Sequence, residues 1–571
     1  MSQNLAYKIF IKTIRVFISI IASLFALILI LIIYYNISSN IIPPKVKDSS
    51  SLTWKREIID SSLYFVKNNW LHKSNTGLWE LYLEGSPFER GASSGNLCKE
   101  LLFEQEVAFT DKLKEMIPNE KYIKFLKYLV YWFNRNLDQH IPLEYQLEIY
   151  GESFFGPKEF EYIGKNYSRM LNYHAAHDIG HALANANMVG CTSFSAKDSA
   201  TEDGSLIIGR NFDFIMGDNF AKHKIVLFIS PDSGYNHALI TWPGFFGAVS
   251  GMNEKGLTIT LNAAPSELPK SAKTPISILS REILQYASNI KEAIEIASKR
   301  KTYVSELLMI GSASDHKTVI IEKSPNQQFI YEEDDCIITC SNHYQTSELN
   351  SFNEVQFEKT STLYRKKRID ELMSKYNSLT AQKAAFILRD RYGLNNIDIG
   401  IGNENAINQM AAHHGVIFMP EQKKMWVSCN PYQLGAFICY DLDTVFNRAK
   451  NFRNDRRELY DLSSSIKPDT FLLTQEYRNW EEFKNQTHEI SMILKGKPGK
   501  VYSEKMLKDM INLNPNFYLG YALAGEYQLK QKEYISGMNF LKQALENNIP
   551  LNTERKKIEK RVEWVEKKLK K

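Results

Sequence analysis

The chain has 571 residues, which is long enough for several domains and a large buried core. Hydrophobic residues make up 44% of it and charged residues 24%, a composition that excludes disordered and fibrous proteins. The formal charge of +5 is too small for a surface of this size to indicate nucleic-acid binding, and 6 cysteines are too few for a disulfide framework.

An apolar run lies near the start of the chain. Residues 16–35 carry no charge and, as a helix, are long enough to cross about 30 Å of hydrocarbon. We expect a short basic N-terminus at 1–15, a single transmembrane helix at 16–35 and a linker at 36–57. A cleaved signal peptide is the alternative, but the run is longer than a usual signal segment and no Ala-x-Ala site follows it. Basic residues flank both ends, and their balance places the main body on the non-cytoplasmic side.

The next segment, residues 58–190, has mainly helical periodicity. Apolar residues recur three and four positions apart in 104–116 and 121–133. A strand-like exception at 79–83 runs into a Glu-Gly-Ser-Pro turn. We therefore expect a mostly helical segment here.

Over residues 191–450 the sequence pattern changes from mainly helical periodicity to short β-type runs. Short β-type runs separated by turn signals occur at 206–208, 225–229, 238–241, 248–250, 257–261, 318–322, 328–331, 337–340, 416–419, 424–428 and 436–441. Amphipathic helices are expected at 276–297 and 363–375. This pattern predicts an α+β domain in which helices pack on antiparallel sheet.

Helical periodicity returns over residues 451–571. Small and aromatic residues between 521 and 544 have the offsets of a single tetratricopeptide hairpin. One such repeat cannot bury its own face. A plain helical hairpin packed on the body and a hairpin that binds a protein partner both stay open.

The densest group of unusual residues surrounds Cys191. A junction of small residues, Gly190-Cys191-Thr192, precedes a predicted β-hairpin whose second strand ends in Arg210 and Asp213. A lone cysteine is usually a buried hydrophobic residue, but the hairpin returns this charged pair to the side of Cys191. If the bond before Cys191 were cut, its α-amine would be the base for the thiol, Arg210 the cation and Asp213 the group that orients the ammonium.

These residues resemble the N-terminal-nucleophile hydrolases of the isopenicillin N acyltransferase and choloylglycine hydrolase type. The acyltransferase branch is the closer match, because it combines a Gly-Cys-Thr-like cleavage junction with a Gly-Arg-Asn-x-Asp segment, found here at 209–213. The similarity continues at 251–257, at 340–343 and at 361–368, and it covers roughly 75–445.

The resemblance implies a four-layer αββα sandwich and makes residues 58–190 a prosegment. It implies autoproteolysis between Gly190 and Cys191, with Cys191 as the nucleophile. The segment before the nucleophile favours the self-processing acyltransferase branch over bile-salt hydrolases. Further roles carried over are an oxyanion-hole amide for Asn262, positioning of the α-amine or substrate amide for Asn342, and a site arginine at Arg365, for which Arg368 is the alternative.

A histidine cluster competes with this interpretation. His174, His177 and His181 share one face of a predicted helix, and His177-Asp178-x-x-His181 imitates a two-histidine zinc motif. Aspartate reaches less far than glutamate as a base, and Gly180 weakens the helix. We therefore favour a polar helix face over a metal site.

Together with the resemblance, the sequence predicts a membrane-anchored, self-processing cysteine amidohydrolase or acyltransferase. Its substrate would be a small N-acyl or lipid-like compound with a linear amide, cleaved through a thioester on Cys191. No organic cofactor or metal is expected, because no phosphate-binding glycine loop or other cofactor motif is found. The alternatives are a phospholipase B-like ester hydrolase of the same fold, a zinc hydrolase built on His174, His177 and His181, and a non-catalytic membrane scaffold.

Overall fold

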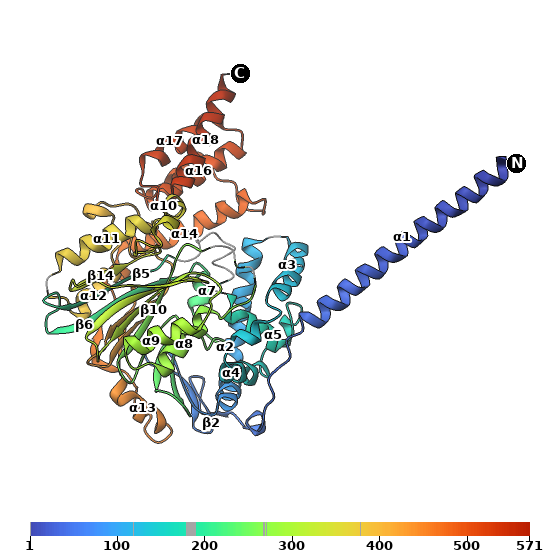
Figure 1. Cartoon of the computed structure of the whole chain (residues 1–571). Coiled ribbons are helices and arrows are strands. Elements are labelled where there is room, and N and C mark those ends of the chain that lie inside the picture. The colour runs from blue at the N-terminus through green and yellow to red at the C-terminus, as the bar shows by residue number, and fades with distance from the viewer. Residues whose placement is uncertain are drawn as a thin grey trace.

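A long N-terminal helix projects from a mixed α/β body, and a group of C-terminal helices stands above that body in Figure 1. The computed structural model describes residues 2–117, 119–176, 178, 190–266, 269, 271–376 and 378–570. The helices of the body are α2 (Pro87–Met116), α3 (Glu120–Phe133), α4 (Leu143–Ser153), α5 (Asn166–His174), α7 (Asp218–Ala221), α8 (Ile276–Tyr286), α9 (Ile290–Lys299), α10 (Glu354–Lys359), α11 (Thr362–Lys375), α12 (Ala381–Leu388) and α13 (Leu442–Lys450).

The N-terminal helix α1, Ser2–Ser38, contains one stretch, Phe10–Ser38, that is long and apolar enough to cross a membrane. This stretch is not buried in the body. Near its end, the Tyr35 hydroxyl donates a hydrogen bond to the carbonyl of Tyr128 on α3, and the Tyr35 ring stacks on Trp132. The end of α1 is therefore held against α3 by aromatic contacts.

The larger sheet has eleven strands within the described residues, in the order β1-β2-β3-β4-β7-β8-β9-β10-β11-β12-β13. Its neighbours are antiparallel except β4 and β7, which pair in parallel. The strands are β1 (Glu57–Ile58), β2 (Leu63–Val66), β3 (Asn69–Lys73), β4 (Trp79–Gly85), β7 (Ile225–Pro231), β8 (His237–Thr241), β9 (Ser250–Asn253), β10 (Leu257–Ala263), β11 (Glu306–Ser312), β12 (Lys317–Lys323) and β13 (Gln328–Tyr331).

The smaller sheet is antiparallel, with seven strands among the described residues in the order β14-β5-β6-β15-β16-β17-β18. The strands are β5 (Thr192–Asp198), β6 (Gly204–Asp213), β14 (Ile337–Cys340), β15 (Ala412–Met419), β16 (Lys424–Ser428), β17 (Phe437–Asp441) and β18 (Asp461–Ile466). The β5–β6 hairpin predicted from the sequence is present, with Ser193 opposite Arg210.

Apolar side chains hold the layers together. One core cluster lies between the two sheets and includes Phe228 from the larger sheet and Ile208 from the smaller one. A second cluster joins the larger sheet to α2, α4, α8 and α9, and a third joins the smaller sheet to α11 and α12. The two sheets therefore pack face to face with helices on both outer surfaces, as Figure 1 shows. The α+β class expected from the sequence is confirmed.

The segment before the junction differs from the helical prediction for residues 58–190. Residues 57–85 form four strands that extend the larger sheet, and β4 pairs with β7 from Trp79 opposite Ile225 onward. Lys67, at a φ of 53°, turns the missed β2–β3 hairpin. The apolar residues within 63–71 are buried on both faces of the sheet, so these short runs have no alternating pattern to distinguish strand from helix.

The C-terminal region has a core of its own. Its helices are α14 (Gln475–Leu494), α15 (Glu504–Asn512), α16 (Tyr518–Lys530), α17 (Tyr534–Glu546) and α18 (Asn552–Leu569). The predicted hairpin is formed by α16 and α17, which approach closely at Gly525 and Gly537. The predicted boundary at residue 450 is too early, because β18 adds a strand to the smaller sheet and ends at Ile466. The short Asp-Leu-Ser-Ser-Ser-Ile sequence of β18 is too polar to be recognised as a strand.

Candidate active site

The start of β5 places Cys191 in the interior, where it is fully buried. Antiparallel pairing of β5 with β6 brings Arg210 back to it, and Arg210 Nη2 donates a hydrogen bond to Cys191 Sγ at 3.3 Å. The same nitrogen donates to the carbonyl of Leu261 on β10, and Nη1 donates to the carbonyl of Val249 at 3.1 Å. The guanidinium is therefore fixed beside the thiol by contacts to the larger sheet.

Two further side chains, linked by hydrogen bonds, also hold Arg210 in place. The sequence did not indicate this arrangement. Arg210 Nη1 donates to Ser250 Oγ at 2.8 Å, and Ser250 Oγ is 2.9 Å from His414 Nε2. Burial keeps the pKa of His414 well below its ordinary value, so this ring is neutral. The signal available in the sequence was the pair His413-His414 on β15, the strand beside β6.

Burial dominates the electrostatics of the thiol. It raises the pKa of Cys191 to about 11, although the charge of Arg210 acts in the opposite direction. In the uncut chain the cysteine is therefore a neutral thiol at pH 7 and needs a base before it can act as a nucleophile.

Asp213 ends β6 on the same side of the hairpin. Its backbone carbonyl accepts a hydrogen bond from the Gly190 amide at 3.1 Å. Its Oδ1 is buried without a hydrogen-bond partner among the described residues. Burial raises the pKa of Asp213 to about 7, against the opposing charges of Arg365 and Arg210. This carboxyl group can accept a nearby cation at low desolvation cost.

Gln409 makes the most direct contact with Gly190, the residue before Cys191. Its Nε2 donates to the carbonyl oxygen of Gly190 at 2.6 Å. A Cβ on residue 190 would lie 2.7 Å from both terminal atoms of the Gln409 amide, so a larger residue there would displace this amide from its present position. Sequence reasoning missed Gln409, because it lies on an irregular segment without a recognisable motif.

Helix α11 supplies the second arginine. Arg365 Nη1 donates to the backbone carbonyl of Cys191 at 2.6 Å, and Nη2 donates to Asn342 Oδ1 at 2.8 Å. Arg368, the alternative considered from the sequence, forms an ion pair with Asp390 at 2.7 Å instead. The structure therefore brings Arg365 and Asn342 to the junction and directs Arg368 elsewhere.

Asn262 lies on β10, where the larger sheet meets β5. Its Oδ1 accepts from Ser193 Oγ at 2.9 Å, and its Nδ2 donates to the carbonyl of Ser341 at 3.0 Å. Nδ2 also lies 3.3 Å from the carbonyl of Cys340. The predicted oxyanion donor is therefore beside β5, the strand that follows Cys191, with its amide hydrogens engaged by backbone carbonyls.

Comparison with known proteins identifies the family. Residues 199–427 match the family model of acyl-coenzyme A:6-aminopenicillanic acid acyl-transferase. This match places residues 199–427 with the N-terminal-nucleophile hydrolases of the isopenicillin N acyltransferase and choloylglycine hydrolase type. The resemblance seen in the sequence is thereby confirmed.

Several individual proteins are similar to this chain. An N-acylethanolamine-hydrolyzing acid amidase of Caenorhabditis elegans is 26% identical over 216 residues, which cover 36% of this chain and 58% of that protein. An uncharacterized protein of Archaeoglobus fulgidus is 22% identical over 352 residues, 54% of this chain and 57% of that one. The chain thus spans little more than half the length of these curated relatives. A solved structure of conjugated bile acid hydrolase from Clostridium perfringens is 13% identical, with a TM-score of 0.33 over 44% of this chain and 93% of that one.

His174, the last residue of α5, is not available as a metal ligand. His174 Nδ1 lies 2.8 Å from the carbonyl of Met170, and Nε2 accepts a hydrogen bond from the backbone amide of Phe246 at 2.9 Å. Both ring nitrogens are therefore used, which corrects the hypothesis of a three-histidine zinc site. His177 and His181 lie outside the described residues.

An aromatic cluster begins beside Arg210. The Arg210 guanidinium lies 4.4 Å from the centre of the Phe212 ring. Ring contacts continue from Phe212 to Phe214 at 5.5 Å, from Phe214 to Phe220 at 5.5 Å and from Phe220 to Trp242 at 5.3 Å. These rings pack against one another, so this side of the site is apolar.

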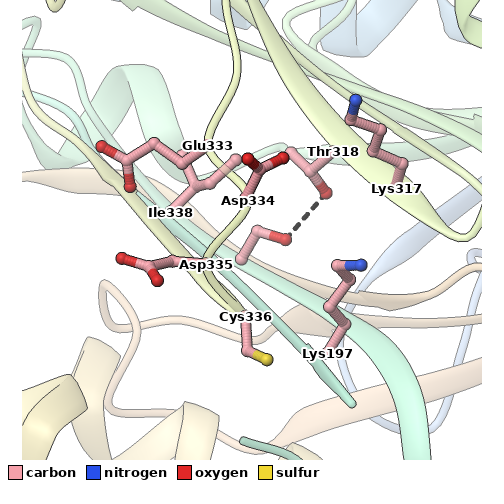
Figure 2. Close-up of a pocket in the computed structure, with 9 residues that line it drawn as sticks. Lys197, Lys317, Thr318, Glu333, Asp334, Asp335, Cys336 and Ile338 are labelled. Carbon is pink, nitrogen blue, oxygen red and sulfur yellow. Dashed lines mark hydrogen bonds between the residues drawn. The ribbon is translucent and has the colours of Figure 1, made fainter.

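Figure 2 shows a separate pocket of about 200 Å³ between β5, β12 and the loop before β14. Its lining is mostly charged: Lys197, Lys317, Glu333, Asp334 and Asp335, with Ser195, Thr318, Cys336 and Ile338. The Ser195 and Thr318 hydroxyls are 2.7 Å apart within it, as the dashed line marks. Ser195 is four residues along β5 from Cys191, about 13 Å at the rise of a strand. This pocket therefore does not hold a group that reacts at Cys191.

Proposed function

We propose that this enzyme is a self-processing cysteine amidohydrolase or acyltransferase that acts on linear amides of N-acyl compounds. The observation that carries the proposal is the convergence of Arg210 and Arg365 on one buried cysteine, with Gln409 donating to the carbonyl just before it. The packing of two sheets between helices supports the four-layer αββα sandwich expected for this family.

Processing comes first. The Cys191 sulfur attacks the Gly190 carbonyl carbon, and Gln409 donates to the oxygen as it becomes negative. The C–N bond breaks, the thiol proton passes to the released amine, and a thioester joins Gly190 to the Cys191 sulfur. Water then hydrolyses the thioester, which leaves a carboxylate on Gly190 and a free thiol and α-amine on Cys191.

Turnover uses the new α-amine as the base. It takes the thiol proton, Arg210 stabilises the thiolate, and the carboxylate of Asp213 orients the resulting ammonium. Sulfur attacks the substrate carbonyl. Asn262 Nδ2 exchanges a contact with the Ser341 or Cys340 carbonyl for a hydrogen bond to the oxyanion, and the ammonium returns its proton to the leaving amine. Water releases the acyl group from the thioester, or an acceptor amine takes it. Arg365 holds the backbone carbonyl of Cys191, and Asn342 accepts a hydrogen bond from Arg365.

The substrate class follows from the surroundings of the site. The aromatic residues that extend from Phe212 to Trp242 favour an apolar acyl group. The C. elegans relative is named for hydrolysing N-acylethanolamines, which supports an N-acyl amide of small or lipid-like type. Hydrolysis is favoured over transfer, because water is always present as an acceptor.

Helix α1 is proposed as a single-pass membrane anchor with the catalytic body on the non-cytoplasmic side. Extraction with alkaline carbonate should leave the protein in the membrane fraction. Protease added from outside should digest the body in intact cells. Release by carbonate contradicts the anchor, and protection from protease contradicts the orientation.

N-terminal sequencing of the larger fragment tests the proposed function directly. Scaling by residue number predicts fragments of roughly 22 and 44 kDa from the 65.9 kDa chain, the larger beginning at Cys191. Cys191→Ala should remain one inert chain, because the N–S shift and the thioester both need sulfur. Cys439→Ala is the matched control, a buried cysteine on β17 that should change neither processing nor activity.

A fragment that starts at any other residue, or a fully active uncut chain, overturns the mechanism. Chelators should leave processing and amide hydrolysis unchanged. Loss of both on chelation, with Cys191→Ala still active, points instead to metal chemistry.

A further inference from the structure

A second group of chemically active side chains lies at the end of the body where β1–β4 and α13 come together (Figure 1). His72 belongs to β3, Glu80 to β4, and Glu458 to the segment between α13 and β18. One ligand atom from each, the imidazole Nδ1 or Nε2 and a carboxylate oxygen, lies within 4.8 Å of the other two. None of these residues takes part in the chemistry described above.

The group is unusual because three buried polar atoms in it lack hydrogen-bond partners. Glu80 is fully buried and accepts one hydrogen bond, from the Tyr440 hydroxyl to Oε1 at 2.9 Å. Its Oε2, the Nδ1 of His72 and the Oε2 of Glu458 have no hydrogen bond within the described part of the chain. His72 Nδ1 and Glu80 Oε2 are 3.5 Å apart, beyond the usual length of a hydrogen bond.

Two of the three side chains in this group are acidic and one is basic. Two carboxylates face one imidazole, so even a protonated His72 compensates only one negative charge. An uncompensated carboxylate in the interior is strongly unfavourable. A divalent cation would neutralise both glutamates and would give each unpartnered atom a ligand bond.

The surroundings hold the three residues in position. The His72 ring packs at 5.2 Å from Phe452, which in turn stacks on Trp70 at 4.3 Å. The Trp70 indole donates to the carbonyl of Ala449 at the end of α13, at 2.8 Å. Strand β3 is therefore fastened to the segment that leads to Glu458.

We propose that His72, Glu80 and Glu458 bind one divalent first-row transition cation, for which zinc is the probe. One imidazole with two carboxylates suits zinc or manganese better than calcium or magnesium, which prefer oxygen ligands alone. Around tetrahedral zinc, ligand atoms at about 2.0–2.1 Å from the metal are roughly 3.3 Å from each other. The 3.5 Å between His72 and Glu80 already matches this spacing. Small rotations of the Glu458 side chain bring its carboxylate to the metal, and water completes the coordination.

The site would join parts of the chain on both sides of the junction. His72 and Glu80 precede Gly190, and Glu458 follows it. Cation binding itself does not depend on cleavage. Its consequence, a metal bridge between two separate chains after processing, rests on the proposed function.

The experiment titrates zinc chloride into the full-length protein after its metals are stripped with chelator. We expect one equivalent to bind at this site and to raise the melting temperature by several degrees at saturation. Affinity for that equivalent should fall at least about 100-fold in His72→Gln and in Glu458→Gln. Glu80 is left unchanged, because its burial makes a variant prone to misfold.

His316→Gln is the matched control. His316 also lies between two carboxylates, at 3.0 Å from Asp198 and 2.8 Å from Glu421, but it is exposed and both of its ring nitrogens are hydrogen-bonded. This variant should bind zinc as the wild type does. Far-ultraviolet circular dichroism of each metal-free variant checks that the fold is retained.

Failure to bind a stoichiometric zinc ion, or unchanged affinity in both His72→Gln and Glu458→Gln, overturns the proposal. Titration of the uncut Cys191→Ala chain separates it from the proposed function. Zinc binding there without any cleavage of the wild type supports the metal site and contradicts self-processing. Cleavage of the wild type without zinc binding supports self-processing and contradicts the metal site.

Discussion

The regions on either side of the catalytic sheets are attached to them in different ways. The segment before the junction supplies β1–β4 to the larger sheet, and its side chains share one core cluster with those of β7 and β10. The C-terminal helices α14–α18 have a core of their own. They meet the body through contacts such as the hydrogen bond from Asn514 Nδ2 to the carbonyl of Ile401 at 2.8 Å. The first region is therefore part of the catalytic fold, and the second is an addition to it.

Expression of the two halves separately gives the largest expected effect. A chain that begins at residue 191 lacks four strands and exposes the edge of β7, at a cost that exceeds the roughly 5–15 kcal/mol stability of a typical domain. We expect it to be insoluble alone and to be rescued by co-expression of residues 1–190. Solubility and circular dichroism measure this. A soluble, folded 191–571 chain would contradict the view that the segment before the junction is an integral part of the fold.

Asn262→Ala should lower turnover about 100- to 1,000-fold, the usual cost of losing one oxyanion donor. KM should change far less, and processing should continue, because Asn262 lies after the junction and does not contact Gly190. Steady-state kinetics on the processed enzyme give both parameters. Full activity of the variant removes Asn262 from the site.

Gln409→Ala should have the complementary effect, since its amide contacts the last residue before the junction. Processing should slow by about 100-fold through loss of the donor to the scissile carbonyl. The fraction that does mature should turn over substrate nearly normally. A gel time course of freshly purified protein measures the first quantity and active-site titration the second. Equal loss in both would place Gln409 in the turnover machinery instead.

The stability of the uncut chain should depend on pH through Asp213. Its pKa is raised to about 7 in the folded state, so it contributes stability below its unfolded pKa near 4, and this is lost as pH rises through 7. The change is at most about 4 kcal/mol. In the Cys191→Ala background, urea unfolding at pH 5 and pH 8 should show this fall, and adding Asp213→Asn should reduce it. An identical pH dependence in both chains contradicts the assignment.

Removal of the C-terminal helices should have the smallest effect on catalysis. A chain that ends at residue 474 loses α14–α18 together with their separate core. Turnover should stay within about threefold of the full-length value, because the catalytic sheets keep their own core. The melting temperature should fall, since Trp480 packs on Tyr432 of the body. Loss of processing or turnover would show that the second region is as integral as the first.

Contacts between residues close together in the sequence could be predicted, and contacts between distant residues mostly could not. The hairpin that joins Cys191 to Arg210 and Asp213 is local, so its geometry followed from the chain itself. Arg365 and Asn342 came from the family resemblance. In the structure Arg365 contacts the carbonyl of Cys191, and Asn342 contacts Arg365. The strands β1–β3 were missed because their apolar runs are short and buried on both faces.

Other features leave no local pattern at all. Gln409 reaches Gly190 from an irregular segment. His72 and Glu458 are brought together only by the packing of β3 against the segment that follows α13. No spacing along the chain encodes such contacts, so they appear only once the tertiary structure is known.

The parallel pairing of β4 with β7 also sets the order of events during biogenesis. Parallel neighbours need a long crossover, and here that crossover contains α2 to α5 and the Gly190–Cys191 bond itself. Closing so long a loop is slow, and Arg365 and Gln409 join the site from still later in the chain. The bond is therefore surrounded by its donors only after synthesis has passed residue 409. The proposed cleavage therefore has to wait until the fold is complete. By then the segments before and after residue 190 are already packed together in one sheet.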